Sequence, residues 1–138
     1  MKKLINTIKE IGMILISLEK LIKKENKYLI SSEINIKKIE LITKEKEFFL
    51  KKLAFLTKIK VLLEKKYNVF FPYSGHDELN YRWNKILSIC SFLKKKNQDN
   101  KRILNQKFYL NERFLSILKK NHADKKNSIY NIDGNLES

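Results

Sequence analysis

Residues 2–30 read KKLINTIKEIGMILISLEKLIKKENKYLI, and the spacing of the apolar residues in this stretch decides the fold. Apolar side chains return at alternating steps of four and three residues, and only Glu25 interrupts their line. This is the heptad repeat of an amphipathic helix that packs against other helices. We therefore predict a helix from Lys2 to Ile30. Its buried positions are Leu4, Ile8, Ile11, Leu15, Leu18, Ile22 and Leu29.

A second heptad line runs from Ile36 to Tyr67, with Lys46 and Lys60 in its gaps. The apolar positions of this line are Ile39, Ile42, Phe49, Leu53, Leu56 and Leu63. Further apolar residues widen it beyond a two-stranded seam, so we expect them to pack inside a bundle; they are Leu41, Phe48, Ile59 and Leu62. Asn35 is the expected N-cap, and the short connection before it predicts an antiparallel hairpin.

The clearest loop runs from Asn68 to His76 and contains Pro72, through which a helix cannot continue. Its aromatic residues are expected to plug one end of the bundle; they are Phe70, Phe71 and Tyr73. Ser74-x-x-Asp77 then has the pattern of a helix start. We predict a third helix from Asp77 to Lys120.

The third helix carries two apolar patches, separated by Asn97 and Asn100. The first patch is expected to pack on the hairpin and consists of Leu79, Trp83, Ile86, Cys90 and Leu93. The second patch is expected to be less buried in the isolated protein and consists of Leu104, Phe108, Leu115 and Leu118, with Asn111 on the same line. Its spacing is typical of a surface that binds another helix, although packing on the chain's own hairpin is the alternative.

The 138 residues carry 30 basic and 15 acidic side chains, for a net charge of +15. All but three of the basic residues are lysines spread over all three predicted helices, and lysine, isoleucine and asparagine share A/T-rich codons. This distribution favours biased composition over a site for a polyanion. A nucleic-acid-binding protein stays the alternative, and its best candidate patch is Lys94-Lys95-Lys96 with Lys101-Arg102.

Catalytic, metal and membrane motifs do not emerge from the sequence. His76 and His122 have no ligand partners at metal-binding spacing, Cys90 lies on an apolar stripe, and no glycine-rich phosphate loop is present. We therefore expect no enzymatic activity and no cofactor. The apolar run Ile11 to Leu18 is too short to span a bilayer and lacks a cleavage site, so we expect a cytoplasmic protein without membrane insertion.

The predicted architecture is all-α: an antiparallel helical hairpin plus a long third helix, forming an elongated up-down bundle. Residues 1–120 are expected to form one helical domain. Residues 121–138 are polar and lack a helical period, so we expect a disordered C-terminal tail with a turn at Asp133-Gly134.

The chain resembles the FlgN family, the flagellar export chaperones for hook-associated proteins, and the match is most specific from Leu79 onward. The matching stretches, in order, are Arg82-Trp83, Asn97-x-x-Asn100 with Ile103-Leu104, Asn111 to Leu118, and Tyr130-Asn131-Ile132-Asp133-Gly134. The last stretch resembles the family's terminal Tyr-Gly-x-Asp-Gly motif, with Asn131 in place of glycine.

The resemblance implies that the protein binds the C-terminal helical segment of a hook-associated protein of the hook–filament junction and delivers it to the membrane export gate. The implied partner-binding residues are Asn97, Asn100, Leu104, Phe108, Asn111, Leu115 and Leu118. Tyr130 occupies the place of the family's gate-docking tyrosine. A purely structural coiled coil, in which the third helix closes a homo-oligomer, is a further alternative.

Overall fold

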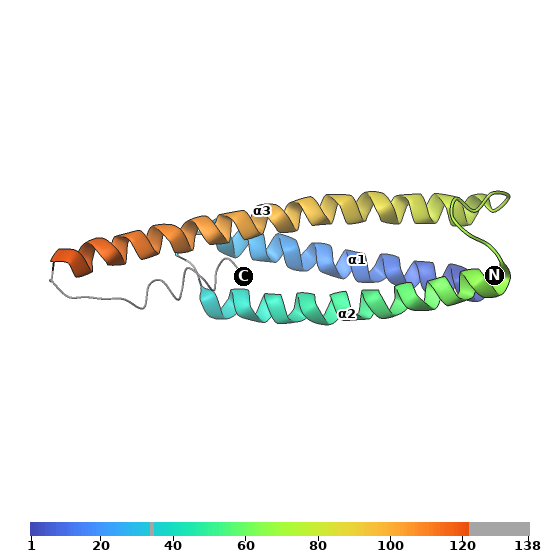
Figure 1. Ribbon diagram of the computed structural model, residues 1–138, viewed down its shortest axis with the longest axis horizontal. Coiled ribbons are helices and arrows are strands. Elements are labelled where there is room, and N and C mark those ends of the chain that lie inside the picture. The colour runs from blue at the N-terminus through green and yellow to red at the C-terminus, as the bar shows by residue number, and fades with distance from the viewer. Residues whose placement is uncertain (34, 122–138) are drawn as a thin grey trace. The chain divides into compact units, whose positions relative to one another are not determined.

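A computed structural model describes residues 1–33 and 35–121, with the backbone alone at residues 111, 114, 115 and 118–121. Over this part of the chain the structure has three helices: α1 (Lys2–Leu29), α2 (Ile36–Tyr67) and α3 (Asp77–Asn121), shown in Figure 1. The all-α prediction is confirmed, and each predicted helix boundary lies within one residue of the observed one. The tail from His122 onward lies outside the described residues.

The helix ends have local causes. The Asn35 side chain accepts a hydrogen bond from the Lys38 backbone N–H at 3.1 Å and so caps α2, as predicted. At the other end of α2, Asn68 adopts a left-handed conformation with φ 53°, which asparagine tolerates better than most residues. Asp77 and Glu78 place two acidic side chains in the first turn of α3, where the helix dipole favours them.

The chain divides into two compact units, Met1–Asn97 and Gln98–Ser138. The division falls inside α3, between the two amides that separate its apolar patches. The first unit therefore comprises α1, α2 and the beginning of α3. The described part of the second unit is the rest of α3.

The core of the first unit forms where α1, α2 and the beginning of α3 pack together (Figure 1). All seven predicted seam residues of α1 are buried. The first patch of α3 also packs here as predicted: Leu79, Ile86 and Leu93 are buried, and Trp83 and Cys90 are half-buried against the same cluster. α1 and α2 contact each other along the hairpin. The heptad lines thus meet as their spacing predicts.

The predicted widening of the α2 seam is wrong for three of its four residues, whereas the fourth, Ile59, is half-buried. Leu41, Phe48 and Leu62 are 59%, 59% and 65% exposed, so they do not help to fill the bundle. The physical reason is that the first unit covers only the seam face of α2, where Ile39, Ile42 and Leu56 are buried. Apolar residues outside that face are left in solvent.

The loop between α2 and α3 plugs the core with one aromatic residue rather than three. Tyr73 is 1% exposed and belongs to the core cluster, whereas Phe70 and Phe71 are about half exposed. The Phe71–Pro72 peptide is cis, and Tyr73 has a positive φ of 58°. The ring of Phe71 meets the ring of Tyr73 edge to face, with 5.8 Å between centroids.

Candidate partner-binding surface

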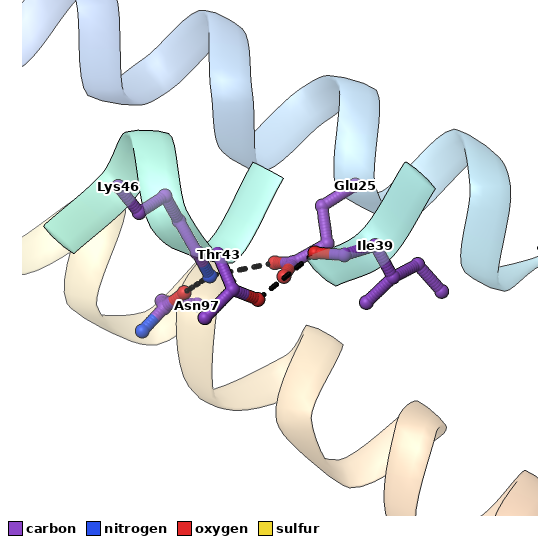
Figure 2. Close-up of polar contacts among 5 residues, drawn as sticks. All are labelled: Glu25, Ile39, Thr43, Lys46 and Asn97. Carbon is purple, nitrogen blue, oxygen red and sulfur yellow. Dashed lines mark hydrogen bonds and ion pairs between the residues drawn. The ribbon is translucent and has the colours of Figure 1, made fainter. Parts of the chain in front are cut away.

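Three of the residues that interrupt the predicted heptad lines, one from each helix, come together in one place. Lys46 Nζ on α2 donates to Glu25 Oε1 on α1 at 2.9 Å and to Asn97 Oδ1 on α3 at 2.7 Å (Figure 2). The side chains of Glu25 and Lys46 are only 7% and 14% exposed, whereas Asn97 lies at the surface. We call Glu25, Lys46 and Asn97 the polar layer. It links all three helices at the boundary of the first unit.

A second buried ion pair anchors the loop at the other end of α2. Lys60 Nζ lies 3.1 Å from Glu64 Oε2, and the Tyr73 hydroxyl donates to the same carboxylate oxygen. Lys60 Nζ also lies 3.8 Å from the centroid of the Trp83 ring, a cation–π contact. Burial, together with the hydrogen bond to Glu64, raises the pKa of the Tyr73 hydroxyl. Lys60 is therefore a structural residue.

The residues predicted to bind a partner lie in and just before the second unit. Asn97 belongs to the polar layer, Asn100 is 3% exposed, and Leu104 and Phe108 are half-buried. Leu104 and Phe108 share one face of α3, because they are four residues apart. The side chains at the other predicted positions, Asn111, Leu115 and Leu118, lie outside the described residues, as does Tyr130.

α3 carries a second apolar stripe that the sequence analysis missed. Helical residues at i, i+7, i+11 and i+14 share a face, and apolar residues occupy these positions at Ile103, Leu110, Phe114 and Ile117. Leu110 and Ile117 are 63% and 55% exposed, and Ile103 is half-buried. Counting from Ile103 at heptad spacing would have found this stripe.

The two apolar stripes of α3 together form one broad face, because Ile103 and Leu104 are consecutive residues and so lie about 100° apart around the helix. Exposed apolar area is unfavourable in water, so an apolar face of this width is normally covered by another element or by a partner. The arrangement on α3 suits the binding of an amphipathic helix, with apolar anchors at heptad-like spacing.

The thiol of Cys90 is the first group to consider for reactivity in the described part of the chain. Burial raises the pKa of the Cys90 thiol, so little of it is the nucleophilic thiolate at neutral pH. Among residues 1–33 and 35–121, no three His, Cys, Asp or Glu side chains gather as metal ligands would. None of the helices in those same ranges has an apolar run long enough to cross a bilayer.

The lysine patch proposed for nucleic acid is only partly available. Lys94, Lys95 and Lys96 are exposed. Arg102, however, pairs with Asp99 through Nη2 and Oδ1 at 3.0 Å, and the two side chains are 68% and 35% exposed. The carboxylate next to this guanidinium reduces the attraction that the patch exerts on phosphate.

Comparison with known proteins places the chain in a family over its full length. The model of the family described as FlgN protein matches residues 1–138. The proteins assigned the name flagella synthesis protein FlgN in two strains of Buchnera aphidicola are similar over their whole lengths. The protein from subsp. Schizaphis graminum is 55% identical over 138 residues, covering 100% of both chains. The protein from subsp. Acyrthosiphon pisum is 44% identical over 137 residues, covering 99% of both. No solved structure matches the chain. The match over the full length shows that this chain belongs to the FlgN family.

Proposed function

We propose that the protein is a cytoplasmic, non-enzymatic flagellar export chaperone. It binds the C-terminal helical segment of a hook-associated protein, keeps that segment from assembling too early and delivers it to the flagellar export gate. Membership of the FlgN family and relatives named for flagella synthesis support the flagellar setting. The two apolar stripes of α3 support the mode of binding.

The observation that carries the proposal is the exposed apolar surface of α3 in the second unit. Leu110 and Ile117 are more than half exposed, and Leu104 and Phe108 are only half-buried. A client helix that covers such side chains removes apolar area from water, which contributes about 25 cal/mol per Å². Binding would also cover the apolar surface of the C-terminal helix of the unassembled hook-associated protein.

The first unit provides the stability that a client-binding surface cannot provide for itself. Its core takes its α3 members from Leu79 to Leu93, and Lys46 ties Asn97 to the hairpin. Substitutions in the second unit should therefore disturb client binding far more than they disturb the hairpin.

The test is co-expression with hook-associated proteins, with and without their C-terminal segments, followed by a pull-down. Leu104→Asp combined with Leu115→Asp should abolish capture, because charged groups would have to be buried at the interface. Most helicity should persist by circular dichroism. Gln98→Asp combined with Ser116→Asp adds the same charge at two exposed positions on the side of α3 away from both apolar stripes, and should retain capture. Capture that survives the leucine substitutions, or that ignores removal of the client's C-terminal segment, would refute the proposal.

Tyr130 is proposed to dock the loaded chaperone on the cytoplasmic domain of the export gate membrane protein. This role follows from the family's terminal motif, and an aromatic side chain buries a large area with few rotors to fix. Tyr130→Ala should leave client capture intact and lower export, measured as secreted client. Loss of capture itself would show that the two roles are not separate.

Nucleic-acid binding is the second candidate, favoured by the exposure of Lys94, Lys95 and Lys96. Salt separates the two functions. Binding to a polyanion weakens steeply as salt rises, whereas capture of an apolar helix does not. A duplex DNA that binds at physiological salt, and that is lost when the three lysines become glutamine, would favour this candidate.

A further inference from the structure

The outward face of α2 carries a line of large apolar residues that the core does not use. Every seventh residue is apolar and exposed: Leu41 by 59%, Phe48 by 59%, Phe55 by 62% and Leu62 by 65%. We call these four residues the outer stripe. Single exposed apolar side chains are ordinary on protein surfaces. Four of them at a constant heptad spacing lie along one helix face, about 10 Å apart.

A line of lysines runs beside the outer stripe at the same spacing. Lys37, Lys44, Lys51, Lys58 and Lys65 each lie four residues before or three residues after a member of the stripe, and all five are exposed. We call them the lysine line. The other flank is also mostly basic and consists of Lys38, Glu45, Lys52, Ile59 and Lys66. The stripe is thus an apolar seam with positively charged borders.

The folded hairpin supports the outer stripe from behind. The Phe48 ring packs edge to face on Phe49, with 5.3 Å between centroids, and Phe49 is half-buried against the core. Lys52 Nζ lies 5.7 Å from the centroid of the Phe48 ring, so a cation already borders the apolar surface. The stripe and its charges are therefore presented on a helix whose opposite side is fixed by packing.

We propose that the outer stripe binds an amphipathic helix of another protein whose apolar seam is flanked by aspartate and glutamate. In a coiled coil the residues beside the seam choose the partner by charge, and five lysines in register call for acidic residues opposite. A second copy of this chain is disfavoured, because it would set lysines against a mostly basic flank. The interface is separate from the α3 stripes and does not rest on the proposed chaperone function.

The outer stripe supplies one apolar residue per heptad, where a full coiled-coil seam supplies two. Charge must therefore carry a larger share of the affinity than in an ordinary coiled coil. Because the lysines are exposed, that share is screened by salt. The complex is expected to weaken measurably as salt is raised from 50 mM to 500 mM, and more so than client capture on α3.

The probe is a synthetic amphipathic peptide of about four heptads with leucine at positions a and d and glutamate at e and g. Its binding to the full chain is measured by fluorescence anisotropy. One matched peptide has lysine at e and g, and another has the acidic composition with scrambled leucines. The proposal expects binding of the acidic heptad peptide and at least tenfold weaker binding of both matched peptides.

Variants locate the binding surface on α2. Phe48→Ser combined with Phe55→Ser should weaken binding by roughly thirtyfold or more, as expected for aromatic anchors. Leu50→Ser removes an apolar side chain of α2 that is 51% exposed but lies off the stripe, and it should have no effect. Because all of these side chains are exposed, the variants should keep wild-type helicity by circular dichroism.

Charge reversal separates recognition from simple attraction to a basic protein. Lys44→Glu, Lys51→Glu and Lys58→Glu together should switch preference from the acidic peptide to the basic one. Lys20→Glu, Lys24→Glu and Lys27→Glu change the net charge by the same amount on exposed positions of α1 and should leave the preference unchanged. Equal effects of the two sets would overturn the proposal.

Two other occupants of the outer stripe are distinguished by the same materials. Sedimentation that shows a dimer of the free chain, lost in the Phe48→Ser and Phe55→Ser variant, would assign the surface to a second copy and overturn the proposal. Peptide binding that appears only after removal of residues 122–138 would assign it to the chain's own C-terminus, with the same consequence. Leu104→Asp with Leu115→Asp should leave peptide binding intact, so a failure of the chaperone proposal can be told apart from a failure of the outer-stripe proposal.

Discussion

Replacing Lys46 with methionine tests whether the polar layer holds the first unit together. The substitution keeps an unbranched side chain of similar length and removes the charge. Glu25, whose side chain is 7% exposed, then stays buried without the ammonium group that lies 2.9 Å from its Oε1. The free energy of unfolding should fall.

The size of that fall follows from the burial of the pair. Removing one partner of a buried ion pair typically costs 3–5 kcal/mol, because the charge that stays buried loses its nearest opposite charge. Lys46 is 14% exposed, and one of its hydrogen bonds goes to Asn97. Asn97 is exposed, so water can replace that hydrogen bond, and the low end of the energy range applies. We expect a loss of about 3 kcal/mol. For a chain of this length, that corresponds to a decrease in Tm of roughly 10 °C.

Chemical and thermal denaturation followed by far-ultraviolet circular dichroism measure this loss. Lys23→Met is the matched control, because Lys23 is 72% exposed and lies 3.8 Å from an exposed carboxylate of Glu19. Exposed pairs contribute little, so this variant should stay within about 0.5 kcal/mol of wild type. Glu25→Leu combined with Lys46→Met should recover most or all of the stability, because no buried charge is left unpaired.

Two outcomes would refute the reasoning. A loss below 1 kcal/mol in Lys46→Met would mean that water or another group satisfies Glu25 without the lysine. A double variant no more stable than the single one would mean that the cost comes from packing rather than from an unpaired charge.

Two further predictions concern the loop and α1. Because the pKa of Tyr73 is raised in the folded state, the contribution of Tyr73 to stability should be fully present below the ordinary tyrosine pKa of about 10 and should fall at higher pH, where the unfolded state ionises first. Denaturation midpoints from pH 8 to 11 should fall more steeply in wild type than in Tyr73→Phe, and equal slopes would contradict this. Apart from its chain neighbours and the nearby helix backbone, no atom lies within 4 Å of the position that a Cβ at Gly12 in α1 would occupy, so Gly12→Ala should stabilise the protein by about 0.5–1 kcal/mol in the same assay. A lower Tm of this variant would show that the added methyl group does not fit.

The helix boundaries could be predicted because each has a local cause. Asn35 caps α2 through its own side chain, and Pro72 prevents α2 and α3 from joining. The buried face of α1 could be predicted because its heptad line has a single interruption. These features depend on residues close together in sequence, and periodicity finds them directly.

The apolar residues of α2 could not all be placed in the same way. Periodicity shows that Leu41, Phe48 and Leu62 lie near the seam, but it does not show how wide a face the bundle covers. That width depends on how many helices pack against α2 and on which sides, which is a property of the whole fold. The lysine line, with a lysine at every seventh position beside these residues, was the sequence signal that this face of α2 is exposed to solvent.

The contact between Glu25, Lys46 and Asn97 also could not be predicted from the sequence, although each residue could be recognised as a polar interruption of a heptad line. Heptad lines fix which side of a helix faces its neighbours, but they leave the axial shift between helices open, because apolar positions recur every turn or two. A hairpin could slide by one heptad and keep much of its apolar contact. It could not keep the 2.9 Å and 2.7 Å contacts of Lys46, or the cation–π contact of Lys60 with Trp83. Two lysines of α2, the mostly buried Lys46 and the buried Lys60, therefore favour a single register for α2 against its neighbours at a cost in desolvation. Fixing that register also fixes where the α3 residues of the core cluster stop, at Leu93, and the proposed partner surface begins beyond that point.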